Sequence, residues 1–429
     1  MAGMTQRPRL LFLCQTLPFP PDGGVWIRTY HVLRLLAQAF DITALCFERA
    51  HRSSNGTNSD NALGCQGLSS FAAVEVFALP QRHSRVRFVW DHLRSTTMGR
   101  VYTRYVYDSR PFQQRLTALL ASGDFALVHL DSLDLARYLP ACAGLPVVCV
   151  HHDVESSLLR RRAALDEAWW RRAYLRYQAR LMRGVERRHC TSLALNLTVS
   201  ERDRALLTTI APGSRAAVVP NGVDVDAFRP VRRRGTGVAY VGGTTPFPNR
   251  DALDYFCGEV LPHLRARKAT GPIRWIGSAT TEERRVYHER HGIELTGYVS
   301  DVRPLMGAAA CHVVPLRTGG GTRLKILNAW AMGKAVVSTS VGCEGLAAVD
   351  GDNILIRDEP ASFADAVIEV LRNNRLQREL GARGRATVER LYSWDVIGRP
   401  MLDAYLALTR SHTRDVISLG PALRAHTGA

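Results

Sequence analysis

The residues best suited to bind an anion lie in a glycine-rich loop in the second half of this 429-residue chain. Three glycines, residues 319–321, follow a short apolar run and precede an amphipathic segment that predicts a helix over residues 322–332. A helix that begins behind such a loop directs unpaired N–H groups and the positive end of its dipole at one point. Arg323 and Lys325 add cations to the first turn, where they disfavour the helix unless an anion is bound. We expect phosphate binding here; a flexible turn before a capped helix is the alternative.

A glycine pair near the start of the chain, Gly23 and Gly24, stands in the same setting. The apolar run over residues 10–14 predicts a strand before it, and a helical pattern over residues 26–39 follows it. Glycines in such a loop let a ligand approach the backbone, and Arg28 in the first turn can reach an anion. We expect a loop that faces the substrate, with an ordinary turn as the alternative.

Polar residues end two buried strands of the first half, at the sheet edge where chemistry is done. His151 and His152 close the strand expected over residues 147–150, and His129 and Asp131 close the one before it. A histidine can hydrogen-bond a sugar hydroxyl or transfer a proton. We favour His152 as the catalytic residue and keep His151 in reserve. The following acidic residue, Asp153, has a structural explanation as a helix cap.

A second glycine pair, Gly242 and Gly243, ends the strand expected over residues 238–241, where a diphosphate could lie against backbone N–H groups. Asn221 and Gly222 are typical of a turn. Neither feature is specific by itself. The chain contains no Walker A loop and no dinucleotide fingerprint, and no DxD pair stands at a convincing strand end. The sequence therefore implies no metal and no cofactor.

Short β-branched runs alternate with amphipathic segments along the chain, which predicts two α/β domains with parallel sheets covered on both faces. We expect an N-terminal domain over residues 1–210, a C-terminal domain over residues 211–393, and a final helix with a polar tail over residues 394–429. Residues 48–69, rich in Ser, Asn and Gly, are expected to form a surface loop. The expected strands are residues 10–14, 42–47, 74–79, 126–130, 147–150 and 193–199, then 216–219, 238–241, 273–276, 293–296, 311–314, 335–340 and 354–356.

The composition is that of a folded protein, with 46% hydrophobic and 22% charged residues. A net charge of +17 predicts attraction to anions, whether phosphate esters, anionic lipids or nucleic acids. The nine cysteines are scattered without zinc-binding spacing, so free thiols in a reducing compartment are expected. The chain start reads as a strand rather than a signal peptide, and no apolar run approaches the roughly 20 residues that span a bilayer. We expect a cytoplasmic protein that can lie at the inner face of the cell membrane.

The run from Arg160 to Arg188 carries ten arginines against three acidic residues, with tryptophans and tyrosines interleaved. Such a segment fits a helix on an anionic membrane surface or an ordinary solvated basic helix. No RNP, zinc-finger or helix-turn-helix signature supports a nucleic-acid surface, so no nucleic-acid partner is expected.

Taken in order, several segments resemble the retaining glycosyltransferases of the GT-B fold, family 4 (glycosyl transferases group 1), and most closely the exopolysaccharide-biosynthesis type. The segments are PFPPDGG, HHDVES, VSERD, VPNGVD, GYVSDVRPLM, VPLRTGGGTRLKIL, WAMGKAVVSTSVG and YSW, which together span nearly the whole chain. The resemblance implies two Rossmann-like doubly wound domains that face each other across a cleft. Ligands of such sheets bind beyond the carboxyl ends of the strands, so the cleft is the expected active site.

The resemblance also implies roles for single residues. His152 matches the cleft histidine near the donor sugar, and either Arg250 or Lys325 is expected to balance the diphosphate. Arg28, His129 and Asp131 belong to the domain that holds the acceptor, a saccharide or a lipid-linked sugar. The positions that match the donor-side loops are Gly23, Gly24, Gly242, Gly243, Gly320, Gly321, Thr322 and Arg323.

One position departs from the family pattern. The family has Glu-x7-Glu here, whose second glutamate accepts hydrogen bonds from the nucleotide ribose, whereas this chain has Gly320 and Asn328. Asn328 keeps a carbonyl acceptor but loses the charge, and charge-assisted bonds are about twice as strong as neutral ones. The leading hypothesis is transfer of a sugar from a nucleotide-diphosphate donor. The alternatives are a degenerate GT-B protein that binds nucleotide or partners without turnover, and a sugar-nucleotide epimerase, which the acceptor-side motifs disfavour.

Overall fold

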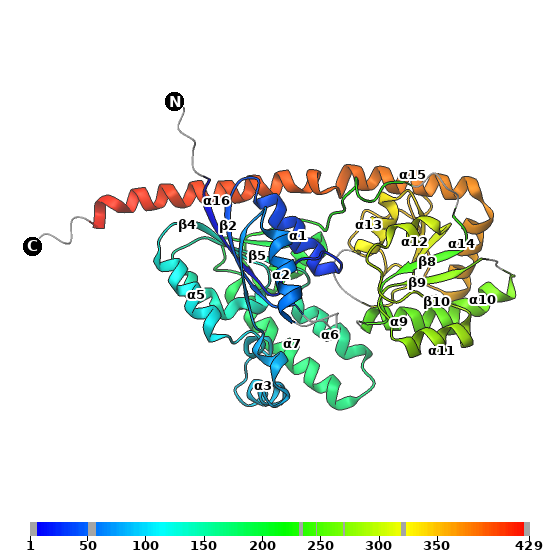
Figure 1. Cartoon of the computed structure of the whole chain (residues 1–429), viewed down its shortest axis with the longest axis horizontal. Helices are drawn as coiled ribbons and strands as arrows, with labels where there is room; N and C mark the ends of the chain where they lie inside the picture. Colours follow the sequence, from blue (N-terminus) through cyan, green and yellow to red (C-terminus); the bar gives the residue numbers. More distant parts are fainter. Residues whose placement is uncertain are drawn as a thin grey trace, which may run out of the picture. The chain divides into compact units, whose positions relative to one another are not determined.

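The structure, a computed structural model, describes residues 7–49, 57–230, 235–245, 247–268, 271–318 and 323–423. It divides into two compact units. Unit 1 comprises Met1–Val219 and Gly398–Ala429, and unit 2 comprises Pro220–Ile397. Each unit is built on its own parallel sheet (Figure 1).

The described residues of unit 1 form a seven-stranded parallel sheet in the order β3-β2-β1-β4-β5-β6-β7. Its central strands are continuous apolar runs, and the side chains of β1 from Leu10 to Cys14 are fully buried. That pattern is typical of strands covered by helices on both faces. The strands are β1 Arg9–Cys14, β2 Asp41–Phe47, β3 Ala73–Phe77, β4 Phe125–Leu130, β5 Val147–His151, β6 Leu195–Thr198 and β7 Ala216–Val218.

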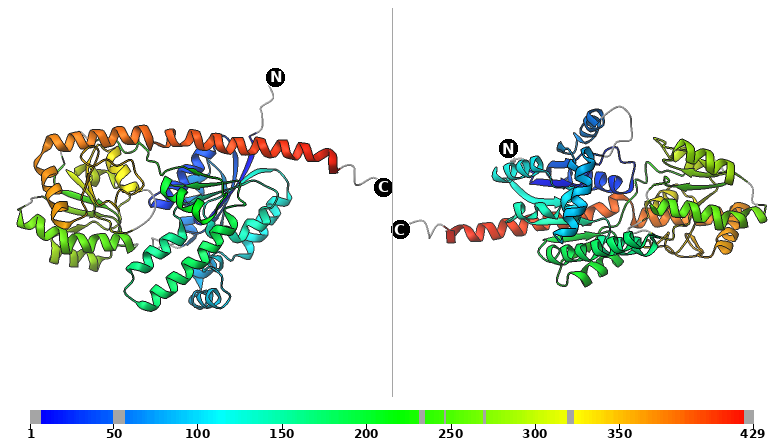
Figure 2. Two further views of the ribbon diagram at one scale, coloured as in Figure 1. Left: turned by 180° about the vertical axis from the view of Figure 1, so that it is seen from behind. Right: turned by 90° about the horizontal axis from the view of Figure 1, so that it is seen from below.

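Three helices of unit 1 begin at a serine that caps them. Ser84, Ser109 and Ser200 each accept a hydrogen bond from a backbone N–H in the first turn of the helix that follows. Figure 2 shows the helices of unit 1 around the sheet. They are α1 Gly24–Leu36, α2 Thr57–Leu68, α3 Arg85–Thr97, α4 Thr103–Val106, α5 Arg110–Ala121, α6 Glu155–Leu165, α7 Trp169–His189 and α8 Glu201–Ile210, with 3₁₀ segments η1 Pro80–His83 and η2 Leu133–Cys142.

The sheet described in unit 2 has six parallel strands in the order β10-β9-β8-β11-β12-β13. The strands are β8 Val238–Val241, β9 Ile273–Ile276, β10 Glu294–Leu295, β11 Cys311–Val314, β12 Ala335–Ser338 and β13 Leu355–Ile356. Its helices are α9 Phe247–Tyr255, the π segment η3 Phe256–Val260, α10 Leu261–Ala266, α11 Thr281–His291, α12 Arg303–Ala308, α13 Leu324–Ala331, α14 Pro360–Arg372 and α15 Asn374–Leu391. The last helix, α16 Trp394–Leu423, begins in unit 2 and belongs to unit 1 from Gly398.

In both sheets the strand order reverses at one point, between β1 and β4 in unit 1 and between β8 and β11 in unit 2. Loops diverge at such a switch point, and ligands of open α/β sheets bind there, beyond the carboxyl ends of the strands. Among the described candidates, His152 follows β5, Asp131 follows β4 and Gly242 follows β8, each at the carboxyl end of its strand. The predicted cleft between the two domains stays a prediction.

Three expectations about the chain's organisation differ from the structure. Residues 216–218 complete the first sheet as β7 by pairing with β6, so the units divide at Val219 rather than at residue 210. The expected loop over residues 48–69 contains α2, in which Gly64 and Gly67 let the helix lie against Leu17 and Phe19. The sequence pattern predicts a helix over residues 394–408 and a polar tail after about residue 410, whereas the last helix continues to residue 423. All nine cysteines are free, as expected.

Candidate functional site

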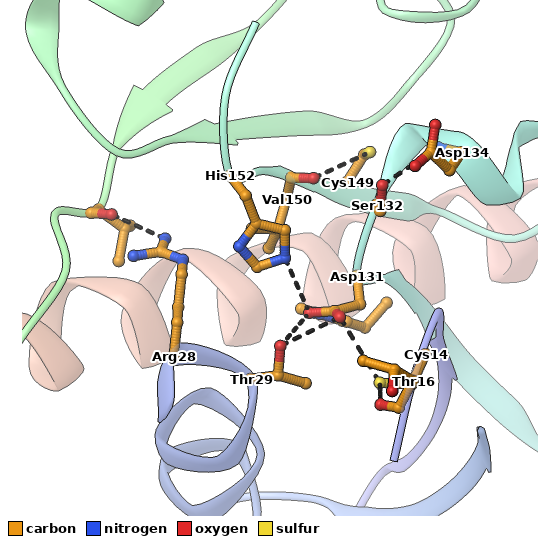
Figure 3. Close-up of polar contacts among 12 residues, drawn as sticks. Cys14, Thr16, Arg28, Thr29, Asp131, Ser132, Asp134, Cys149, Val150 and His152 are labelled. Atoms are coloured by element: carbon orange, nitrogen blue, oxygen red, sulfur yellow. Dashed lines mark hydrogen bonds and ion pairs between the residues drawn. The ribbon is translucent and has the colours of Figure 1, made fainter. Parts of the chain in front are cut away.

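The carboxyl edge of the unit 1 sheet brings together His152, which follows β5, and Asp131, which follows β4. His152 Nε2 lies 3.6 Å from Asp131 Oδ1, and the two side chains are 10% and 1% exposed (Figure 3). Thr29 of α1 donates from Oγ1 to both carboxylate oxygens, at 2.9 and 3.1 Å. Cys14 Sγ lies 3.5 Å from Oδ2. A buried carboxylate held in this way can orient the imidazole of His152.

Asp131 is ionised in this setting. Burial by itself raises the pKa of a carboxyl, but the charge of His152 and contacts with His129 and His152 outweigh it, so the pKa of Asp131 lies below its usual range. The carboxylate thus provides a fixed negative charge beside His152. At 3.6 Å the contact between the two side chains is longer than a direct hydrogen bond.

His129 lies behind Asp131 and is fully buried. Its Nδ1 is 2.7 Å from the hydroxyl of Tyr405 on α16, its Nε2 is 3.9 Å from Asp131 Oδ1, and its ring stacks on Phe12 at 3.9 Å. Burial lowers the pKa of His129, and Asp131 partly offsets this. His129 and Asp131 were expected on the acceptor side, but both side chains point into unit 1 and contact residues of this chain.

The other expected residues of unit 1 are also engaged inside it. Arg28 is 1% exposed and donates from Nη2 to the carbonyl of Val219 at 2.7 Å. Burial lowers the pKa of Arg28 to about 10. Gly23 is the N-cap of α1, which begins at Gly24, and a Cβ at Gly23 would meet the ring of Trp26 at 2.5 Å. The glycine at this position therefore has a packing role in addition to the expected contact with a ligand.

His151, the reserve candidate, is a structural residue. It is 4% exposed, its Nε2 lies 2.9 Å from Asn196 Oδ1, and burial lowers its pKa to about 4. His152, in contrast, stands at the end of the strand, beside the switch point. The N-cap of the next helix is Val154 rather than Asp153, and it makes no side-chain capping bond.

In unit 2 the cation at the switch point is Lys325, in the first turn of α13. Its Nζ lies 2.5 Å from the hydroxyl of Tyr240 at the end of β8 and 3.0 Å from Asn249 Oδ1 on α9. Burial, and then the nearby charge of Arg323, lower the pKa of Lys325 to about 7. An anion at this point would restore the charged form of the amine. Arg323, the N-cap residue of α13, is 9% exposed.

Arg250, the other cation expected to balance a diphosphate, is already paired. It forms an ion pair with Glu283 and donates to the hydroxyl of Tyr287 at 3.0 Å. Lys325 is therefore better placed than Arg250 to receive a phosphate.

The glycine pair after β8 lies against the end of β9. Gly242 has φ of 156°, and its N–H donates to the carbonyl of Ile276 at 2.8 Å. A Cβ at Gly243 would approach the carbonyl oxygen of Ser278 to 2.7 Å. The two loops pack closely at this point, which explains why both positions are glycine. They leave the expected binding of a diphosphate as a prediction.

Asn328, the departure from the family pattern, is 9% exposed on α13. Gly320, Gly321 and Thr322 lie outside the described residues, so their expected role as a phosphate loop stays a prediction. In the part of the chain that the structure describes, no group of three or more His, Cys, Asp or Glu could hold a metal ion. None of the described helices is long and apolar enough to cross a membrane.

Sequence reasoning missed five residues that hold these two clusters together: Cys14, Thr29, Tyr240, Asn249 and Tyr405. Thr29 stands one position after Arg28 on α1, and the helical period of that segment places it on the buried face. No local signal identifies Tyr405, because it reaches His129 from the other end of the chain, 276 residues away.

Two family models match successive parts of the chain. Residues 22–227 match the model described as Glycosyltransferase Family 4, and residues 235–373 match the one described as Glycosyl transferases group 1. Among curated proteins, the phosphatidyl-myo-inositol mannosyltransferase of Mycobacterium tuberculosis is 25% identical over 305 residues, which cover 67% of this chain and 75% of that protein. The protein of the same name from Mycolicibacterium smegmatis is 24% identical and covers 72% and 78%.

Solved structures share the fold. HepE of Anabaena in complex with UDP superposes with a TM-score of 0.65 at 14% identity, covering 93% of this chain and all of that one (100%). Sucrose-phosphate synthase of Thermosynechococcus elongatus has a TM-score of 0.68 at 16% identity and covers 94% and 100%. At these identities the likeness shows the fold, which is GT-B. The chain belongs to the family 4 glycosyltransferases (glycosyl transferases group 1) and is a glycosyltransferase.

Proposed function

We propose that this glycosyltransferase moves a sugar from a nucleoside-diphosphate donor to a saccharide or lipid-linked acceptor, with retention of the anomeric configuration, in polysaccharide biosynthesis. The observation that carries the proposal is the contact between His152 and the ionised, buried Asp131 at the switch point of unit 1. A carboxylate that orients an imidazole is an arrangement used to position and polarise a reacting group.

Unit 2 binds the nucleoside diphosphate. Lys325 and Arg323 stand at the N-terminus of α13, whose dipole favours an anion. These groups stabilise the negative charge that develops on the departing diphosphate, which is the main electrostatic task in such a transfer. Solved complexes of HepE with UDP and with UDP-glucose support a nucleotide sugar as the donor class.

His152 orients the donor sugar rather than acting as a nucleophile. The leaving phosphate takes the proton of the acceptor hydroxyl on the same face of the sugar, and the new bond keeps the configuration of the old one. The names of the mycobacterial relatives, phosphatidyl-myo-inositol mannosyltransferases, support a lipid-linked acceptor.

A panel of nucleoside diphosphates and their sugars, screened by thermal shift, tests the donor class, because a ligand that binds the folded state raises its stability by mass action. Proton NMR of the transferred or hydrolysed sugar then gives its anomeric configuration. A product with inverted configuration contradicts the retaining mechanism. A panel in which no nucleoside diphosphate raises the melting temperature contradicts the donor class.

We also propose that the arginine-rich segment from Arg160 to Arg188 contacts an anionic membrane surface. It comprises the second half of α6 and nearly all of α7, and these two helices pack against each other (Figure 1). Trp169 and Trp170 at the start of α7 are 73% and 58% exposed. Exposed tryptophans among arginines favour the interface of an anionic bilayer. In liposome flotation at low salt, the protein is expected to float with anionic vesicles and to stay behind with neutral ones. Equal recovery with both contradicts the contact.

A further inference from the structure

Unit 1 contains a cavity of about 530 Å³ whose lining includes neither His152 nor Asp131. Its walls are the loop that follows α3, the short helix α4, the 3₁₀ segment η2 and the C-terminal half of α7. The volume is in the range of sites that bind small molecules, about 300–1,000 Å³.

The charged groups of this cavity are almost all cationic. Asp134 is the one carboxylate in its lining, and burial raises the pKa of Asp134. Arg137 is paired with Asp108 at 2.5 Å. The other four guanidinium groups have no ion pair or hydrogen bond within the described part of the chain. They belong to Arg100, Arg104, Arg180 and Arg188.

The pKa of His189, at the end of α7, reflects this excess of positive charge. Burial, and then the charges of Arg188 and Arg104, lower the pKa of His189. Cations from α4 and from α7 thus act on the same imidazole, which places their charges close together. Bringing like charges together is unfavourable, and a bound anion offsets that cost.

Apart from Thr103, Tyr177 and His189, the remaining side chains of the lining are aliphatic and suit a hydrocarbon chain. Val101, Leu133 and Ala136 are buried in this lining, and Leu181 and Val185 of α7 are half-buried in it. On the neighbouring helix α3, which packs on α7 through Ser95 and Gln178, large apolar side chains are exposed (Figure 1). They include Val86 (80%), Val89 (66%), Trp90 (54%) and Leu93 (51%).

We propose that this cavity binds a phosphate group carried on an apolar chain, as in a lipid phosphate. Arginine clusters bind phosphate oxygens through several charge-assisted hydrogen bonds, and the aliphatic side chains of the lining receive the first methylene groups of the chain. This inference deepens the proposed contact with anionic lipid, because it assigns a saturable site for one lipid molecule. Binding at this site can be measured without catalytic turnover and without adsorption of the protein to vesicles.

The test is isothermal titration calorimetry of the full chain with dihexanoyl phosphatidic acid, kept below the concentration at which it forms micelles. We expect saturable binding of one molecule. Replacing Arg104 or Arg188 by glutamate is expected to weaken it about tenfold or more, since a charge-assisted bond is lost and a repulsion added. Inorganic phosphate is expected to bind about tenfold more weakly than the lipid, because it buries no apolar surface.

Two matched controls distinguish an effect on the cavity from an effect of net charge and from a loss of folding. Arg187→Glu changes the net charge as Arg188→Glu does, on the same helix, at a position outside the cavity lining. Gly184→Leu fills the cavity without changing its charge, because a Cβ at Gly184 meets no atom within 4 Å. Gly258→Leu adds the same side chain to a helical glycine of unit 2 that also faces open space.

The expected result is that Arg188→Glu and Gly184→Leu bind the short-chain lipid weakly, whereas Arg187→Glu and Gly258→Leu bind it as the wild type does. Thermal melts verify that each variant is folded. The proposal is overturned if the wild type does not bind the lipid, if all four variants bind equally, or if inorganic phosphate binds as tightly as the lipid. Liposome flotation of the same variants shows whether a loss of lipid binding is specific to this cavity or extends to membrane adsorption in general.

Discussion

Asp131 Oδ1 lies 3.6 Å from His152 Nε2, and the carboxylate is held in place by two contacts from Thr29 at 2.9 and 3.1 Å. The pair joins the ends of two adjacent strands, β4 and β5, at the edge of the sheet where the strand order reverses. Asp131 is buried and contacts protein groups, and we propose that it positions His152.

Substitutions of His152 and Asp131 are expected to distinguish a side chain that contacts the substrate from one that positions another side chain. His152→Ala should lower turnover by about a hundredfold, because loss of the side chain that orients the donor sugar misplaces the reacting atoms. Asp131→Asn should lower turnover as well but leave the KM for the donor nearly unchanged, because Asp131 acts through His152. Steady-state kinetics of both variants check this. A KM that rises while turnover is unchanged contradicts the positioning role.

Asp131 also links stability to pH. Its pKa is depressed in the folded state, so it contributes stability that is present above the unfolded pKa, about 3.9, and is lost as the pH falls through the folded pKa. Urea denaturation of the wild type and Asp131→Asn, from pH 7 down to pH 3, is expected to show a stability difference that is largest at neutral pH. The difference should shrink as the pH falls below about 4. A difference that is constant with pH contradicts the assignment of an ionised carboxylate.

Tyr405→Phe tests whether α16 supports the site. The change removes the hydroxyl 2.7 Å from His129 Nδ1 and leaves a buried nitrogen without that partner, which costs about 1–3 kcal/mol of unfolding free energy. The matched control is Tyr105→Phe, because Tyr105 is also buried and its hydroxyl forms no hydrogen bond among the described residues. Chemical denaturation of both variants measures the difference. Equal stabilities contradict a structural role for this hydrogen bond.

Donor binding is expected to depend on the ionisation of Lys325, whose pKa is about 7. Only the protonated amine attracts the diphosphate, so affinity for a nucleotide sugar should fall as the pH rises through this pKa. At pH 8, where most of the free amine is neutral, binding should take up close to one proton. Calorimetry in buffers of different ionisation enthalpy measures that uptake. Lys325→Arg keeps the charge at all these pH values and is expected to abolish it; uptake that persists in this variant assigns the proton to another group.

Asn328→Glu distinguishes an active transferase from a degenerate one. A carboxylate at this position adds a charge-assisted bond to the nucleotide ribose, so donor affinity is expected to rise about tenfold. We expect the wild type to show donor hydrolysis or transfer, and the variant to lower the KM for the donor. Activity that is absent in the wild type and present in the variant would favour the degenerate alternative instead.

The sequence by itself determined the two α/β domains, because apolar runs that alternate with amphipathic segments can be buried only in helix-covered parallel sheets. Most strands lie within two residues of their expected bounds, and β8, β9 and β11 match them. The strand ends also placed His152 and Asp131 at the carboxyl edge of the first sheet, since parallel strands bring their carboxyl ends to one edge, but they did not pair the two residues.

Only the tertiary structure decided the partners of these residues. Strand pairing assigned residues 216–218 to the first sheet, and burial showed that Arg28, His129 and Asp131 face inward. The same holds for Tyr405, which meets His129 across 276 residues, and for Tyr240, which meets Lys325 across 85. Local patterns report which face of an element is buried, whereas long-range side-chain contacts depend on how the elements pack, which no local pattern encodes.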